Sequence, residues 1–388
     1  MPKVRIREAR KRTTGDRPPF VALCLLGARG TEVMDLLGPY ETLAASRLFD
    51  VFTVASTSRP APLSGNLFAV PDYALLEMSA DDTAAVIESA DVVVVPNVFD
   101  AGEPMLLEFL KRYGGGKWVL SVCEGARMVA ASGLLESKVA VTHFHALNEL
   151  GRKHPSVRFL HGHRYIHTGN IITSAGVSAG IDSSLFLIEK MGSPAHADAT
   201  SDRMEYEGRV RETDPDGKVE GRPPSFTIGT TEGVKLMGRT FSPWGKRVIA
   251  VAVMPDVGET LLGAVVDAFP RTGKVKLMTF TPEEQVGPVA TAHGLAVLPQ
   301  FTAGVLKEPV HHVLVPSSQP TKDGQEEDFL KVKRALERRH LGEVPITLLS
   351  VPAGKALNEV LDLVQKLIGR KEAALVAKMM EHHWKPDA

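Results

Sequence analysis

A single cysteine stands between two small residues at the end of a strand-like segment. The pentapeptide Ser121-Val122-Cys123-Glu124-Gly125 follows the apolar run KWVL and precedes ARMVAASGLL, which has the pattern of a helix. A nucleophile on a sharp strand-to-helix turn needs small residues two positions before and after it, because larger side chains would collide. The amino end of the following helix would favour the thiolate. We therefore predict a functional thiol at Cys123, with a buried structural cysteine as the alternative.

The second cysteine, Cys24, lies inside the apolar run FVALCLLG and is expected to be structural. Two cysteines far apart in 388 residues suit a reducing compartment better than a disulfide framework. The basic segment before this run resembles a signal peptide, but the run has only the length of a strand and no small-residue cleavage pattern follows. We predict a solvated basic tail, a buried first strand and a cytoplasmic protein.

The positions of the apolar runs indicate the fold that holds Cys123. Four runs of strand length lack alternation, as buried parallel strands do, and amphipathic helical segments separate them: residues 20–27, 49–56, 90–97 and 117–124. This alternation is typical of a doubly wound α/β fold. The segment HRYIHTGNIITS predicts a hairpin around Thr168, Gly169 and Asn170. These elements fit a first domain over residues 18–208.

The same order of elements begins again near residue 246. A stretch rich in Gly, Pro and charge, residues 209–245, predicts a linker. After it, KRVIAVAVM, KVKLMTF, HGLAVLPQFTA and VHHVLVPSS echo segments of the first half in order. We predict two tandem flavodoxin-like, doubly wound parallel-sheet domains, the second (246–388) smaller, degenerate and without the cysteine. In it either Pro352 takes the place of Cys123 or the whole elbow is deleted.

Several motifs of the first half resemble the ThiJ/PfpI superfamily, which is class I glutamine amidotransferase-like. They are MDLLGPYE, SVCEGARMVAASGLL, VTHFHALNEL and GNIITSAGVSAGIDSSLFLIEKM. The nearest branch resembles isonitrile hydratases and the sensor domains of AraC-type regulators. The resemblance covers nearly all of residues 20–208, whereas the second half resembles the family only in outline.

The resemblance implies partners for the thiol. Asp35 matches an acidic side chain that reaches the thiol, and one proton shared between the two groups would be the workable arrangement. The alternative for Asp35 is a helix N-terminal residue that complements the dipole. Glu41 fits a solvated or structural helix residue. His143 falls where the branch has a histidine, which would be a base or a structural side chain.

Two positions depart from the family pattern. Isonitrile hydratases carry a threonine directly after the nucleophile, whereas this chain has Glu124, whose carboxyl disfavours a thiolate but could act as general base for water. The family has glycines after the strand VVVVP, whereas this chain has Asn97 and Val98. The oxyanion hole would then rest on the Glu124 N–H alone, and one lost donor costs about 10²–10³ in rate.

Five histidines in the first half invite a zinc interpretation: His143, His145, His161, His163 and His167. No cysteine or acidic residue has ligand spacing near them, so a solvated hairpin face is the preferred interpretation. The sequence therefore predicts neither a metal site nor a cofactor.

Two functions fit these residues. The first is a cysteine-dependent hydrolase or hydratase acting on a small electrophile, with Cys123, Asp35, Glu124 and His143 as its site. The second is a non-catalytic redox or stress-sensing protein, or a regulator-type sensor without its DNA-binding module. The expected partner is a small-molecule substrate or an oxidant. A net charge of −1 and the lack of a basic recognition helix argue against nucleic acid and membranes. The duplication predicts an intrachain pseudo-dimer and leaves a further homodimer open.

Overall fold

The computed structural model describes two compact units. The described residues are 20–113, 116–210, 226, 228–229, 236, 238–239, 245–306, 309–318 and 321–384. The basic tail before residue 20 and most of the predicted linker 209–245 lie outside them. Residues 1–61, 70–203 and 208–225 cluster as the first unit, and residues 62–69, 204–207 and 226–388 as the second. No helix among the described residues is both long and apolar enough to cross a membrane.

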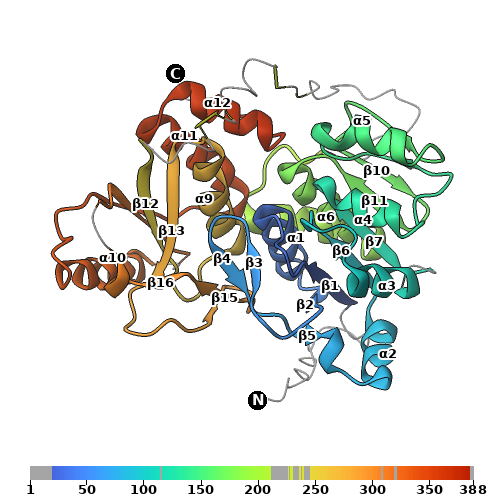
Figure 1. Ribbon diagram of the computed structural model, residues 1–388, viewed down its shortest axis with the longest axis horizontal. Helices are drawn as coiled ribbons and strands as arrows, with labels where there is room; N and C mark the ends of the chain where they lie inside the picture. The colour runs from blue at the N-terminus through green and yellow to red at the C-terminus, as the bar shows by residue number, and fades with distance from the viewer. Residues whose placement is uncertain are drawn as a thin grey trace. The chain divides into compact units, whose positions relative to one another are not determined.

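The first unit is built on a seven-stranded sheet (Figure 1). Its strand order is β10-β11-β7-β6-β1-β2-β5, and every pairing is parallel except that of β10 with β11. The strands are β1 (Phe20–Leu26), β2 (Phe49–Ala55), β5 (Tyr73–Ala74), β6 (Val92–Val95), β7 (Trp118–Val122), β10 (Tyr165–Thr168) and β11 (Ile171–Ser174). The α/β fold with a parallel sheet and the hairpin around Gly169 are as the sequence predicts.

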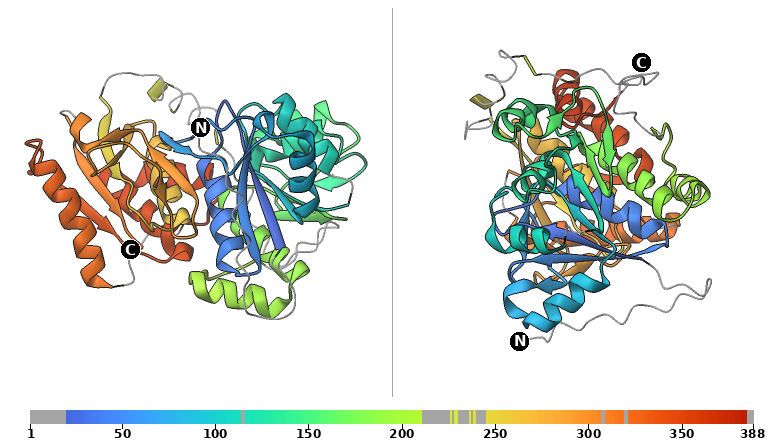
Figure 2. Two further views of the ribbon diagram at one scale, coloured as in Figure 1. Left: turned by 90° about the horizontal axis from the view of Figure 1, so that it is seen from below. Right: turned by 90° about the vertical axis from the view of Figure 1, so that its right-hand side faces the viewer.

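Helices cover both faces of this sheet. On one face α1 and α6 pack against each other, and on the other α3 packs on α4, which contacts β6 and β7. Figure 2, left, shows α1 in blue and α3 in teal on opposite sides of the blue strands. The helices are α1 (Val33–Ala45), α2 (Ala80–Ser89), α3 (Pro104–Tyr113), α4 (Ala126–Ala131), α5 (Phe144–Lys153), α6 (Val177–Met191) and α7 (Pro194–Met204). A short pair, β8 (Val139–Ala140) and β9 (Arg158–Phe159), lies beside α5 in sequence.

Burial explains why the strands carry unbroken apolar runs. All four residues of β6, VVVV, are buried, and so are the last five of β1. A parallel strand between two helical layers has no solvent face, so alternation is lost. In open α/β sheets, ligands bind outside the carboxyl ends of the strands, where the loops begin.

The second unit has its own five-stranded parallel sheet of order β16-β13-β12-β17-β18. Its strands are β12 (Arg247–Ala252), β13 (Val275–Thr281), β16 (Phe301–Thr302), β17 (His312–Pro316) and β18 (Ile346–Leu349). Helix α10 (Lys322–Glu337) packs on the face that carries Ala250, Ala252, Val313 and Val315. Helices α9 (Glu259–Arg271), α11 (Ala356–Leu367) and α12 (Arg370–Met379) contact one another.

A hairpin from the first half of the sequence belongs to the second unit. Strands β3 (Ala61–Leu63) and β4 (Leu67–Ala69) join β14 (Val289–Ala290) and β15 (Ala296–Pro299) in a sheet of order β14-β15-β4-β3. β4 runs antiparallel to β15. The turn residue Asn66 donates from Nδ2 to the carbonyl of Leu277 at 2.7 Å. This pairing joins two stretches more than 200 residues apart and is not among the features predicted from the sequence.

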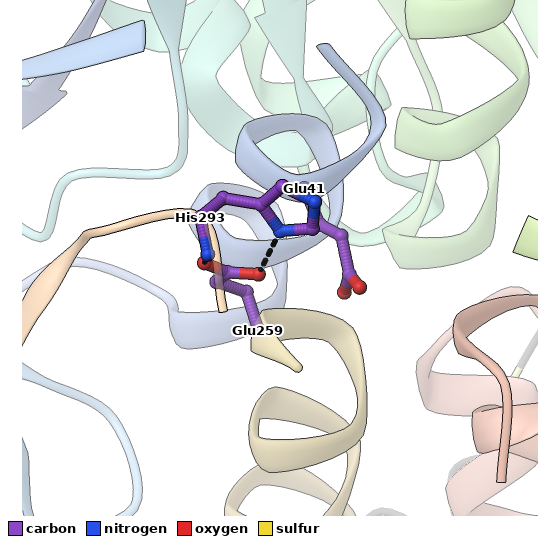
Figure 3. A group of neighbouring side chains, drawn as sticks. All are labelled: Glu41, Glu259 and His293. Carbon is purple, nitrogen blue, oxygen red and sulfur yellow. Dashed lines mark hydrogen bonds and ion pairs between the residues drawn. The ribbon is translucent and has the colours of Figure 1, made fainter. Parts of the chain in front are cut away.

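A buried carboxylate fixes the loop above α9 in the second unit. Glu259 is fully buried, and its Oε2 lies 2.8 Å from Nδ1 of His293 (Figure 3). Its Oε1 accepts hydrogen bonds from the Thr291 hydroxyl at 2.5 Å and from the His293 amide at 2.9 Å.

Glu41, also drawn in Figure 3, lies on α1 of the first unit. It is only 8% exposed, so of the two expectations for Glu41, a solvated or a structural helix residue, the solvated one is wrong.

Candidate functional site

Cys123 lies at the junction of β7 with a single turn of 3₁₀ helix, Cys123–Gly125, that leads into α4. Its φ is 56°, in the left-handed region that side chains other than glycine rarely occupy, and 7% of the residue is exposed. Such a conformation costs about 1–2 kcal/mol and is typical of nucleophile turns. The predicted strained elbow is therefore present.

Gly125 makes this turn possible. A Cβ at this position would lie 2.1 Å from the carbonyl oxygen of Val95 and 3.0 Å from that of Pro96. The backbone of the turn after β7 thus packs directly against the backbone at the end of β6. The hydroxyl of Thr142 donates to the carbonyl oxygen of Cys123 at 2.8 Å, which fixes the other side of the strained residue.

Asp35 reaches the same edge of the sheet from α1. It is fully buried, and its Oδ2 accepts a hydrogen bond from the backbone N–H of Asn97 at 3.3 Å. Asn97 follows β6, the neighbour of β7. Its N–H, which would otherwise be a candidate oxyanion donor, is thus directed to an oxygen of the Asp35 carboxyl group. A contact between Asp35 and the Cys123 thiol stays a prediction.

Glu124 forms the centre of a charged network beside the thiol. Its Oε2 accepts from Nε of Arg127 at 2.7 Å, and its Oε1 lies 3.1 Å from Nδ1 of His145 and 3.8 Å from that of His143. Nη1 of Arg127 also binds Oε1 of Glu149 at 2.8 Å. Burial raises the pKa of the Glu124 carboxyl, but the hydrogen bond and charge of Arg127, with His145 and His143, outweigh it and hold the pKa below its ordinary value. Glu124 is therefore an ionised hydrogen-bond acceptor, which makes it a weak base.

His143 has a structural contact in addition to its place near Glu124. It is the N-cap of α5, where its Nδ1 accepts from the backbone N–H of His145 at 3.4 Å, and its ring packs on Phe144 with centroids 4.3 Å apart. Whether His143 is also a base stays a prediction. Arg127 and Glu149 are not among the site residues predicted from the sequence. The three-residue spacing of Glu124 and Arg127 on a helical turn was the available signal for the first.

His167, one of the five histidines, packs against aromatic rings. The ring of His167 lies between those of Trp118 and Phe186, at centroid distances of 5.4 and 5.3 Å. Within the described part of the chain, none of the five histidines belongs to a group of three ligand-type side chains close enough to share a metal ion.

Cys24 differs from Cys123 in its surroundings. It is fully buried inside β1, and both burial and the charge of Asp72 raise the pKa of its thiol far above the ordinary value. A thiol that stays protonated in an apolar strand is unreactive. The expectation that Cys24 is structural fits this environment.

The family model of the DJ-1/PfpI family matches residues 21–190. This confirms the resemblance to the ThiJ/PfpI superfamily that the motifs indicate. Among curated proteins, the isonitrile hydratase of Pseudomonas putida is 28% identical over 178 residues, which cover 45% of this chain and 73% of that protein.

Several solved structures are similar to part of this chain. A ThiJ/PfpI family protein from Pseudomonas syringae matches with a TM-score of 0.45 at 22% identity. The matched region covers 60% of this chain and 92% of that protein. DJ-1beta of Drosophila melanogaster has a TM-score of 0.42 at 17% identity, over 47% of this chain and 96% of its own. An AraC family transcriptional regulator from Pseudomonas putida has a TM-score of 0.40 at 16% identity, over 48% and 98%.

Proposed function

We propose that the chain is a cysteine-dependent hydratase or hydrolase that acts on a small electrophile, similar to isonitrile hydratase. The observation that carries the proposal is the φ of 56° at Cys123, on a strand-to-helix turn of a DJ-1/PfpI domain. A protein maintains such a strained residue only where its surroundings hold it firmly, and these places concentrate at active sites. The sequence similarity to an isonitrile hydratase suggests the reaction type.

The site residues fit a two-step addition of water. The Cys123 thiolate attacks the terminal carbon of an isonitrile, and a proton from Asp35 goes to that carbon, which gives a thioimidate. Water then adds to the thioimidate carbon, and its first proton goes to the nitrogen through His143. As the S–C bond breaks, the hydroxyl proton of the adduct returns to the pair of Asp35 and the departing thiolate, and an N-substituted formamide leaves. The Glu124 N–H would stabilise negative charge that develops during addition.

In this scheme the Glu124 carboxylate positions the water and does not remove its proton. Arg127 and His145 hold its two oxygens, and its pKa is lowered. An ionised, immobile carboxylate beside the thiol orients a water molecule through a hydrogen bond and keeps other anions away. His143, 3.8 Å from the same carboxylate, would be the base that accepts the water proton.

A redox-sensing function is the second candidate. The hydrogen bond from the Asn97 N–H to Asp35 favours this function. An enzyme that stabilises an oxyanion would use such a donor for its substrate. A thiol on the same elbow would then be oxidised to sulfenic and sulfinic acid. A regulator-type sensor without its DNA-binding module would use the site in the same way.

The test is turnover with isonitriles and α-oxoaldehydes, together with the thiol pKa of Cys123 from the pH dependence of alkylation. Cys123→Ser should abolish turnover and leave the fold intact, since sulfur and oxygen are close in size. Cys24→Ser is the matched control. Undiminished activity of the Cys123 variant would overturn the enzyme proposal. A low thiol pKa with no turnover, and a mass gain at Cys123 after peroxide, would favour the sensor.

For the second half we propose a degenerate repeat of the same fold that serves as an internal partner. The strand order β13-β12-β17-β18 in the second unit corresponds to the order β2-β1-β6-β7 in the first. The segments around β4 and β15 are similar in sequence, and these two strands pair in antiparallel direction. Antiparallel pairing of equivalent segments is what two-fold symmetry produces. We therefore favour an intrachain pseudo-dimer, with a further homodimer left open.

The deletion of the elbow in this repeat is supported by its helix packing. After β18, a turn at Ala353–Lys355 leads into α11, which packs on α9. In the first unit the helix that packs on α1 is α6, whereas the elbow helix α4 packs on α3. α11 is thus the counterpart of α6. Among the described residues of the second unit, no helix near α11 is a counterpart of α4. We also propose a cytoplasmic location, a small-molecule or oxidant partner, and no role in binding nucleic acid or membranes.

A further inference from the structure

A groove of about 460 Å³ runs along the carboxyl half of α5 in the first unit. One wall is the helix, with Asn148, Gly151 and Arg152. The other wall is the segment from Pro155 to His161, which contains β9. This volume lies within the usual range of small-molecule sites, about 300–1,000 Å³. No residue of the proposed catalytic site lines it.

The groove is positively charged. Arg152, Arg158 and His161 line it and are exposed, and no carboxylate is among its lining residues. Within the described residues neither arginine takes part in an ion pair. Glu149 precedes Arg152 by three residues, a spacing at which opposite charges on a helix normally meet. Its Oε1 is instead held 2.8 Å from Nη1 of Arg127.

Helix electrostatics accounts for only part of this charge. Arg152 and Lys153 lie in the last turn of α5, where cations complement the partial negative charge of the helix end. Arg158 and His161 belong to a different segment, yet both line the same groove. Two arginines from separate segments therefore line one space, an arrangement that suits an anion with more than one charged oxygen.

Gly151 keeps this space open. It lies inside α5, where glycine is unfavourable because of its backbone entropy. A Cβ built at this position meets no atom within 4 Å, and its φ is not in the left-handed region. Neither packing nor backbone conformation therefore requires glycine here. Gly151 lines the groove, so the absence of a side chain at this position leaves that space open.

We propose that this groove binds a small, multiply charged anion, either an organic phosphate or a polycarboxylate. The guanidinium groups of Arg152 and Arg158 hold its charged oxygens, and the side chains of Asn148 and His161 donate further hydrogen bonds. The half-buried ring of Phe159 provides an apolar contact for the rest of the ligand. The proposal does not depend on the reaction at Cys123.

Calorimetric titration of the full chain at low ionic strength tests the site. Inorganic pyrophosphate is the probe for a phosphate ligand and citrate the probe for a polycarboxylate. The variant with both Arg152→Gln and Arg158→Gln should bind the effective probe at least about tenfold more weakly, because each lost guanidinium removes a charge-assisted hydrogen bond. Lys153→Gln is the matched control, since it removes one charge from the same helix turn outside the groove. Gly151→Leu should also weaken binding, by filling the space, while the helix is retained.

Saturable binding of either probe that the double arginine variant weakens and Lys153→Gln leaves unchanged supports the proposal, and the probe that binds identifies the ligand chemistry. Binding that is equally weakened by Lys153→Gln would reveal diffuse surface charge and overturn it. So would binding that Gly151→Leu and the double variant leave unchanged, or the absence of saturation with both probes. Thermal unfolding of each variant establishes that it is folded.

Discussion

Contacts on both sides of Cys123 hold its backbone in the left-handed region. Gly125 lies against the carbonyl of Val95, and Thr142 binds the carbonyl of Cys123 itself. The chemistry of the thiol therefore depends on residues that never touch a substrate. A disturbance of this turn would move the sulfur relative to Asp35 and Glu124, and displacements of that size are costly in catalysis.

Gly125→Ala should destabilise the first unit by about 2–4 kcal/mol, because the added methyl group collides with backbone atoms that cannot rotate away. Urea-induced unfolding measures the loss. Gly151→Ala is the matched control: it places the same methyl group on a helix with open space beside it, and should stabilise the protein by up to about 1 kcal/mol. Equal stability of Gly125→Ala and the wild type would mean that the turn is not as tightly packed as the structure has it.

Glu124→Gln should lower stability near pH 7 by about 1 kcal/mol, the size of a partly screened charged hydrogen bond. The folded-state pKa of Glu124 lies below its unfolded value, so the contribution is present above the unfolded pKa and is lost as pH falls through the folded one. The difference between variant and wild type should therefore shrink as pH drops below about 4.

Urea unfolding of both proteins at several pH values between neutral and about 3 measures this difference. Glu136→Gln, on an exposed glutamate outside the network, is the control and should show no comparable pH-dependent difference. A gap between Glu124→Gln and the wild type that stays constant with pH would argue that the glutamate acts through packing and not through its charge.

At the scale of single elements, the hairpin β3–β4 is held to the second unit through its turn. The Thr279 hydroxyl donates to the carbonyl of Asn66 and accepts from the N–H of Gln300 at 2.9 Å. Thr279→Val keeps the volume of this buried side chain but leaves both partners unsatisfied, which should cost about 1–3 kcal/mol.

Urea unfolding and limited proteolysis within residues 62–69 measure the effect of Thr279→Val. Thr281→Val is the matched control on the same strand, because the Thr281 hydroxyl accepts from the N–H of Glu283 at 3.2 Å and not from the hairpin. If the two variants were cleaved at the same rate in residues 62–69, the Thr279 contact would not hold the hairpin.

The sequence predicts well those elements whose evidence is local. The runs of β1, β2, β6 and β7 carry their burial in an unbroken apolar pattern, and the hairpin around Gly169 has its turn chemistry next to its strands. The elbow is equally local, because the small residues around Cys123 are adjacent in sequence.

The pairing of β4 with β15 could not be predicted in this way. Both strands are four residues or shorter, and they lie more than 200 residues apart in the sequence. No local pattern therefore specifies their contact. The network of Glu124 was missed for a related reason. His145 and Glu149 reach it from α5, which is distant in sequence from the elbow helix. Charged side chains alone do not indicate which segment they will face.

At the scale of the whole molecule, the hairpin makes the two halves of the sequence interdependent. Residues 62–69 lie in the first half, yet they complete a sheet of the second unit, where Leu67 and Ala69 are fully buried. A fragment of residues 18–208 would carry this hairpin without β15. The free edge of β4 and its apolar side chains would then be exposed, which favours association between chains.

Expression of three chains tests this dependence: the full chain, the fragment 18–208, and the same fragment with residues 62–69 replaced by a short Gly-Ser loop. We expect the plain fragment to aggregate or to unfold at a lower urea concentration than the full chain, because its hairpin has lost the strand that pairs with it. The loop-replaced fragment should be monomeric and soluble, since the seven-stranded sheet and its helices are complete without the hairpin. Size-exclusion chromatography and urea unfolding distinguish these outcomes. A plain fragment that is monomeric and as stable as the full chain would contradict the proposal that the second half serves as an internal partner. Aggregation of both fragments would mean that the first unit needs more of the second unit than a partner for its hairpin.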